Sequence, residues 1–507
     1  MIRHPWAAGK PVPPRRPAGS SRQARTQRAA AALAAALALS GCAAVGPTYR
    51  EPEPTLPAGF ANPAPRSATA GSAGRIAHEG RTVELVRWWE GFADAPLAAL
   101  IDDAQRSNPT VGQAVARVQQ ARAALVVAGA AGVPQLNLQT GAQRSTQFFF
   151  TQAGPAILPI TALQAGLDAS WEIDLFGRIA RGQQAARLQA EAGERSWHDA
   201  RATVAAEVAR AYVQVRACGA RREALDRQRR SVDEALRIDA LRLSAGRIAA
   251  SSAAQTRATA AEVRARLDDA QSRCAAAEAS LAEVAGLDVA RVRERVGALP
   301  VGIPAFAGGA GQTVPADLLR QRPDVAAAER RLAAASEQIG EAAAAQYPSF
   351  SITGAFTLNR VSALGNDFNY KSWSIAPGLR LPLLDGRRRR AQVEQRQAQY
   401  DEAYEAWRAQ VARAVAETET ALGQLAALLD LVEADDDAVA QYAIALRAEE
   451  QRNRAGRTDT LELERARRAL LNAESAAIDA REALAIGWVA LYKAVGGGWD
   501  AQQVAAR

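Results

Sequence analysis

The chain has 507 residues with only 5% aromatic side chains, and its formal net charge of +8 comes mainly from one end. Residues 1–41 hold seven basic side chains and no acidic one, which leaves a net charge of +1 for the rest. That balance excludes a basic nucleic-acid-binding surface as the dominant feature. The only histidines are His4, His78 and His198, and no Gly-x-x-x-x-Gly-Lys loop occurs. The sequence therefore predicts no histidine-based catalytic site, no clustered metal site and no enzyme.

The N-terminal segment has the pattern of a signal peptide. A basic stretch up to Arg28 precedes an apolar run from Ala29 to Leu39, which is too short to span a bilayer. The following Leu-Ser-Gly-Cys resembles a bacterial lipobox, which implies that residues 1–41 are removed and that Cys42 is lipidated. This covalent lipid is the only non-protein group expected. The alternative is an ordinary signal peptide with an incidental cysteine.

Residues 42–93 are rich in Pro, Gly and Ala and lack periodicity, so we expect an extended tether from the lipid anchor. Trp88-Trp89 opens the folded region. Helices are predicted over 95–106 and 110–131, separated by Asn108-Pro109. A first strand is predicted to begin at Pro134, and residues 148–159, which contain Gly154, Pro155 and Pro159, are expected to form a loop.

The stretch from Leu163 to Gly177 alternates strictly between apolar residues and small, polar or charged ones. Alternation with a period of two predicts a strand with one apolar face and one polar face. From Arg178 to Ser244 there is no proline, which allows a helix about 100 Å long at 1.5 Å per residue. Gly246 ends it, a second helix is predicted over 249–285, and residues 286–315 form a linker region.

The same pattern then restarts. Arg322-Pro323 follows Asn108-Pro109 at an offset of 214 residues, and the turn at Gly456-Arg457 follows Gly246-Arg247 at an offset of 210. A further strand pair precedes Gly386, and another long helix follows it. Landmarks in one order at nearly one offset indicate an internal duplication, with repeats over 94–315 and 316–507.

Four amphipathic strands that run directly into long helices favour a membrane protein. The apolar strand faces need cover, which lipid supplies when the polar faces line a lumen. Four strands cannot close a barrel, and open edges are not tolerated in lipid. The predicted fold class is therefore a mixed membrane protein: four strands contributed to a shared transmembrane β-barrel, plus long antiparallel helices that form a tube of coiled coils.

Several short stretches, in a fixed order along the chain, carry a resemblance to a known family. They are the lipobox with Val45-Gly46-Pro47-Thr48-Tyr49, Trp88-Trp89, Asn108-Pro109, Ser170-Trp171-Glu172-Ile173-Asp174-Leu175-Phe176-Gly177-Arg178, Arg320-Gln321-Arg322-Pro323-Asp324-Val325, Asp385-Gly386 and Leu491-Tyr492-Lys493-Ala494-Val495-Gly496-Gly497-Gly498-Trp499. With these stretches the sequence resembles the outer membrane efflux factors, the TolC-type channels, in the lipoprotein branch that serves resistance-nodulation-division pumps. The resemblance implies a homotrimer with a twelve-stranded barrel and a periplasmic α-barrel, anchored in outer membrane lipid. It also implies an adaptor and an inner-membrane pump as partners, and passive export of small molecules such as drugs.

Two alternatives remain open at this point. One is a channel for type I protein secretion, against which the lipobox argues because that branch commonly lacks the anchor. The other is a coiled-coil envelope scaffold without a pore, against which the amphipathic strands argue.

The resemblance places the closing constriction near the turn at Gly456. The gate candidates are Leu461, Glu462, Glu464 and Arg465, with Arg465 where the family usually has an acidic residue. We expect Arg465 to find a carboxylate on a neighbouring helix. The alternative is that these are ordinary salt-bridging residues on a helix surface.

Two further features are candidates for a structural or binding role. The run Arg387-Arg388-Arg389-Arg390 is either a binding patch or a solvated collar at the start of a helix. Cys218 and Cys274 are both 28 residues from Gly246, so an antiparallel helix hairpin would place them at one height. Disulfides persist in the periplasm, which makes a bridge between them a candidate; the alternative is two unrelated small buried residues.

Overall fold

The computed structural model describes residues 45–54, 56, 59–62, 87–151, 154–297, 299–306, 319, 321–363 and 366–497. The predicted signal peptide and Cys42 lie outside these residues. The chain forms two compact units, and both repeats contribute to each of them. The strand unit comprises 131–181 and 340–393 with the described part of 1–47, and the helix unit comprises 182–339 and 394–507 with the described part of 48–130.

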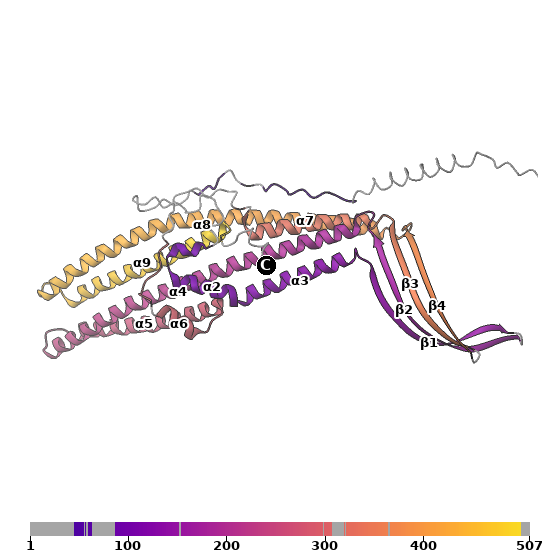
Figure 1. Cartoon of the computed structure of the whole chain (residues 1–507). Coiled ribbons are helices and arrows are strands. Elements are labelled where there is room, and N and C mark those ends of the chain that lie inside the picture. Colours follow the sequence, from indigo (N-terminus) through magenta and orange to yellow (C-terminus); the bar gives the residue numbers. More distant parts are fainter. Residues whose placement is uncertain are drawn as a thin grey trace, which may run out of the picture. The chain divides into compact units, whose positions relative to one another are not determined.

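The strand unit holds one antiparallel sheet of four strands in the order β1-β2-β3-β4 (Figure 1). Each strand pairs with the one before it in the sequence, so β1 and β4 form the two edges. Within the described chain, no further strand pairs with either edge. The strands are β1 (Gln135–Thr151), β2 (Gly154–Ile173), β3 (Ser349–Ala363) and β4 (Asn366–Arg380).

The prediction of a loop over 148–159 was wrong. β1 continues to Thr151 and β2 starts at Gly154, with Pro155 paired to Phe150 and Pro159 to Thr146. Two prolines fit here because β3 ends at the level of Ile160, so this part of β2 has a free edge on one side. Proline lacks an N–H donor, and a free edge requires none.

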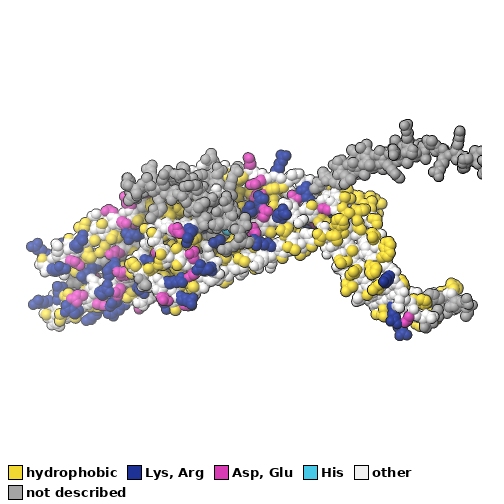
Figure 2. All heavy atoms as spheres, viewed as in Figure 1, with side chains coloured by type: hydrophobic (Ala, Val, Ile, Leu, Met, Phe, Trp, Pro, Cys, Tyr) yellow, Lys and Arg dark blue, Asp and Glu magenta, His cyan; other side chains and the backbone are white. Residues whose placement is uncertain are grey.

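The register gives the sheet one apolar face, because directly paired residues point to the same side. One row across the four strands consists of Leu138, Leu167, Phe356 and Trp373. These side chains are at least 43% exposed in a single copy of the chain. Figure 2 shows apolar side chains gathered over the strands.

Long antiparallel helices make up most of the described part of the helix unit. The predicted helix from Arg178 to Ser244 is present, and its counterpart in the second repeat is equally long. Among the described residues, no helix combines the length and apolarity needed to cross a membrane. The helices are η2 (Trp88–Phe92), α2 (Ala95–Ser107), α3 (Pro109–Ala130), α4 (Arg178–Ser244), α5 (Ala250–Ala285), α6 (Val289–Gly297) within the predicted linker, α7 (Pro323–Ala344), α8 (Arg388–Arg454) and α9 (Thr460–Ala494).

The two helix hairpins turn in the same way. At the end of α4 the N–H of Arg247 donates to the carbonyl of Arg242 over 2.8 Å, and at the end of α8 Arg457 donates to Arg452 over the same distance. Gly246 and Gly456 adopt φ of +66° and +69°, a left-handed conformation that favours glycine. The duplication seen in the sequence is therefore repeated in backbone geometry.

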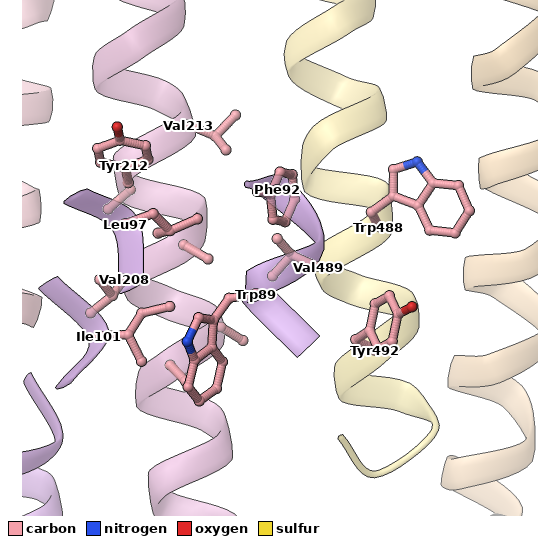
Figure 3. Close-up of a cluster of buried hydrophobic side chains, with 14 of the residues drawn as sticks. Trp89, Phe92, Leu97, Ile101, Val208, Tyr212, Val213, Trp488, Val489 and Tyr492 are labelled. Carbon is pink, nitrogen blue, oxygen red and sulfur yellow. The ribbon is translucent and has the colours of Figure 1, made fainter. Parts of the chain in front are cut away.

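The main core joins the two repeats around the short helix η2 (Figure 3). The Trp88 ring stacks on Tyr492 of α9 with centroids 5.5 Å apart. The Tyr212 hydroxyl of α4 donates to Asp94, and Asp94 accepts from the N–H of Leu97 to cap α2. Although 42–93 was expected to be a tether, its last residues belong to this core.

The described residues from 45 to 62 form neither helix nor strand, and they are held against the helices. The Tyr49 hydroxyl donates to Glu329 of α7 over 2.7 Å. The N–H groups of Ala61 and Asn62 donate to the carboxylate of Glu419 on α8 over 2.6 and 3.1 Å. This N-terminal strap, residues 45–62 where described, satisfies its polar groups with the body of the protein rather than with solvent alone.

Arg322 ties the beginning of the second repeat to the end of the same repeat, at the C-terminal end of α9. Its side chain is 4% exposed and donates to Asp324, to Glu417 of α8 and to the carbonyl of Ala494, each within 3.0 Å. A buried guanidinium is stable only when its donors are matched in this way.

We predict that Arg322→Met lowers the free energy of unfolding by about 3 kcal/mol, because it removes the buried guanidinium that pairs with Asp324 and donates to the carbonyl of Ala494. The shift in the urea midpoint of the detergent-solubilised protein measures the effect. Arg465→Met, which removes an exposed ion pair, should cost less than about 1 kcal/mol. Equal losses in both variants would contradict the role given to Arg322.

Candidate channel wall and constriction

The second face of the sheet is polar and suits the lumen of a channel. Gln164, Asp168 and Glu172 of β2 point to the side opposite Leu167, and the register pairs them with an asparagine, an alanine and a serine of β3. At the end of the strand the Arg178 guanidinium donates both to Oε1 and to Oε2 of Glu172, over 3.1 and 2.9 Å. A wall made of this sheet therefore has lipid-compatible and water-compatible sides.

The first helix hairpin is covalently closed. Cys218 of α4 and Cys274 of α5 form a disulfide, with Cα atoms 5.5 Å apart and both residues buried. The structure thus brings together the two cysteines singled out by their equal distance from Gly246. The disulfide joins α4 to α5 within one hairpin, and each cysteine is 28 residues from the turn at Gly246.

The second hairpin carries the gate candidates on the first turns of α9. Asp459 caps the helix by accepting from the N–H of Glu462 over 2.9 Å. Leu461 is half-buried and Glu462 is exposed, whereas Glu464 is buried. The helix therefore does not present the four candidates as one cluster.

The expectation that Arg465 pairs with a neighbouring helix was wrong. Its guanidinium pairs with Glu462, one turn earlier on α9, with N and O 2.5 Å apart. The buried Glu464 pairs in the same way with Arg467 over 2.6 Å. Residues three apart on a helix lie on the same side, so each of these ion pairs forms within α9 itself.

Ion pairs between α4 and α9, which the sequence did not reveal, connect the two hairpins. Arg221 of α4 contacts both Asp479 and Glu482 of α9. Burial alone would lower the pKa of Arg221, but the hydrogen bonds that it donates to these carboxylates outweigh burial and raise its pKa. Arg227 adds a second contact, 3.1 Å from Glu474. Only the charged composition of the helices hinted at these pairs, because the partners are about 250 residues apart in sequence.

The arginine run does not form a single patch. Arg387 has a φ of +71° just before α8, and Arg389 turns back to Asp385, with N and O 2.9 Å apart. Arg387 and Arg388 are exposed. Arg389 thus contacts a residue that precedes α8, and this contact helps to fix the start of the helix.

A charged cavity of about 500 Å³ lies between α4, α7, α8 and the end of α9. Burial and, to a smaller extent, the charge of Asp324 raise the pKa of Asp199 to about 6. Burial would also raise the pKa of Asp324, but its hydrogen bonds with Arg322 outweigh burial and hold it below the ordinary value. The cavity therefore contains a carboxyl group with a raised pKa, and its lining residues form no arrangement resembling a catalytic site.

The family profile described as outer membrane efflux protein matches residues 100–287 and 314–497, once for each repeat. The chain belongs to the outer membrane efflux protein family. It is 29% identical to the pyoverdine export outer membrane protein OpmQ of Pseudomonas aeruginosa, over 92% of this chain and 97% of that one. It is 30% identical to the outer membrane protein OprJ of P. aeruginosa, over 91% and 94% of the two chains.

The fold agrees with this assignment. The structure superposes on the CmeC outer membrane channel of Campylobacter jejuni with a TM-score of 0.79 at 20% identity, over 90% of this chain and 96% of that one. The predicted fold class and the internal duplication are confirmed. The chain is an outer membrane efflux channel that extends into the periplasm, and it is not an enzyme. Its family works in tripartite systems with an adaptor and an inner-membrane pump.

We predict that Ile375→Lys blocks membrane insertion while Ser374→Lys does not. Ile375 lies mid-strand on the apolar face, where a lysine costs about 2–4 kcal/mol at the bilayer midplane, whereas Ser374 lies on the polar face. The membrane-extracted fraction of each variant, compared with wild type, measures insertion. Equal insertion of the two variants would show that the faces are assigned incorrectly.

Proposed function

We propose that the chain works as a homotrimer whose three sheets close one twelve-stranded barrel. The observation that carries this proposal is the open sheet with two long unpaired edges, β1 and β4, and an apolar face. In lipid, each unpaired backbone group costs several kcal/mol, so the edges must pair with those of other copies. Three copies of four strands fit the range of strand numbers found in outer membrane barrels.

We also propose that the duct is passive and that its cargo is small molecules such as drugs. Two relatives are named for export of pyoverdine and of cations, respectively. The polar face of the strands offers a wet wall without a selective binding site, which favours a broad range of cargo. Energy for export then has to come from the pump in the inner membrane.

The proposal is tested by measuring the mass of the particle and its channel conductance on the same purified protein. Native mass spectrometry in detergent should give three copies per particle, and planar bilayers should show discrete channel openings. A particle of another stoichiometry, or trimers without conductance, would overturn it. The second outcome would favour the scaffold interpretation.

The constriction is proposed to lie at the second hairpin tip, with Leu461 as its apolar element. We predict that Leu461→Ser raises the basal conductance several-fold, because a polar side chain no longer excludes water from the closed tip. Leu241→Ser, which changes a 60% exposed leucine near the turn of the first hairpin, serves as the control. An unchanged conductance in folded Leu461→Ser trimers would remove Leu461 from the gate.

Cys42 is proposed to carry the lipid anchor. We predict that Cys42→Ser abolishes incorporation of radiolabelled palmitate, because the serine hydroxyl cannot form the thioether of a lipoprotein. The variant should still trimerise, since strand pairing and not the lipid closes the barrel. Palmitate labelling that persists in Cys42→Ser would contradict the anchor.

A further inference from the structure

The charged residues of the strands are divided between the two faces of the sheet, and those on the apolar face lie at similar levels along the strands. The strands contain seven of them, and the register places Asp168, Glu172 and Arg380 on the polar face. The other four lie on the apolar, lipid-facing side, and all of them are near the hairpin end of the sheet. We call these the cationic belt: Arg144, Arg360, Asp367 and Lys371.

The belt has a net charge of +2. Arg360 is paired with Asp367, which also accepts from the hydroxyl of Ser362 over 2.5 Å. Arg144 and Lys371 are exposed, and no acidic partner occurs for either among the described residues of the strands. The belt therefore carries positive charge that no acidic residue of the described strands neutralises. Figure 2 shows Lys and Arg side chains near this end of the strands.

A groove accompanies the charges. It has a volume of about 380 Å³ and an apolar floor of Leu163, Ala165 and Leu358, with Arg360 and Lys371 beside it. Arg360 is directly opposite Asn369, so Lys371 is its diagonal neighbour, with Cα atoms roughly 7–8 Å apart. Two cations at that separation can share one phosphate. Arg360 contacts Asp367 through Nη2, and its guanidinium carries further N–H donors with which it can bind a phosphate.

The height of the belt matches a lipid headgroup layer. Lys371 and Leu379 are eight residues apart on β4, about 26 Å at 3.3 Å per residue and about 20 Å along the normal at a tilt near 40°. The apolar rows between them fill most of the band of about 25 Å that barrels present to lipid. The hairpins lie at the strand ends opposite those joined to the periplasmic helices, so the belt is on the cell-surface side.

We propose that the cationic belt binds the phosphate groups of an outer-leaflet glycolipid, a phosphorylated and multiply acylated sugar of the lipid A type. The phosphate lies against Lys371 and Arg360, and the acyl chains lie along the apolar rows of Trp373 and Ile375. The combination of an apolar floor and cations on one face selects an anionic amphiphile over a free anion. This site rests on the proposed barrel in one respect: barrel closure brings the β1 edge of one copy, with its Arg144, beside the β4 edge of the next.

The test uses native mass spectrometry of the full-length protein in detergent, titrated with bisphosphorylated lipid A. Wild type should bind lipid A at least ten-fold more tightly than zwitterionic phosphatidylethanolamine. The double variant Arg360→Gln, Lys371→Gln should lose at least ten-fold in affinity. Arg360→Lys, Lys371→Arg, which keeps the charge, should retain most of the affinity. Arg447→Gln, a change of an exposed arginine on α8, should leave binding unchanged.

Three outcomes would overturn the proposal. These are unchanged lipid A affinity in the double glutamine variant, equal affinity of wild type for lipid A and phosphatidylethanolamine, and displacement of lipid A by millimolar inorganic phosphate. The last would indicate a simple anion site. The same spectra report copy number, so trimers that do not select lipid A refute only this inference, whereas the absence of trimers refutes the proposed function.

Discussion

The free edges of β1 and β4 are the constraint on which the rest of the molecule depends. A four-stranded sheet with one apolar face is stable neither in water, where that face is exposed, nor in lipid, where its edges are. Only closure with other copies satisfies both faces and both edges. The duplicated chain supplies two hairpins per copy, and each strand joins a helix at the same end of the sheet.

Alternation and spacing predicted most of this architecture. The strict period of two identified β2 from Leu163 onward, and the absence of proline together with the break at Gly246 identified α4. These signals are local, and nothing in the surrounding structure opposes them. The offset between the two hairpin turns could also be predicted from the sequence, because each turn requires a glycine with positive φ at a fixed place.

The features missed from sequence depend on distant partners. Prolines 155 and 159 suggested a loop, and only the early end of β3 explains why they fit into a strand. The N-terminal strap has no periodicity, yet Glu419, more than 350 residues away, holds it in place. At the tip of the second hairpin, the resemblance to the family located the gate candidates. It did not reveal that Arg465 pairs with Glu462 on its own helix.

The two hairpins differ in one way that bears on how a duct of this kind opens. At the offset of 210 residues, the positions of Cys218 and Cys274 in the first hairpin are occupied by Leu428 and Leu484 in the second. The first hairpin is therefore cross-linked, whereas the second has no such bond at these positions and is joined to the first by ion pairs such as those of Arg221. Ion pairs at a half-exposed surface exchange readily with water, and a disulfide does not. Separating α9 from α4 at these ion pairs therefore costs less than separating α4 from α5, so the disulfide makes the first hairpin the more rigid of the two.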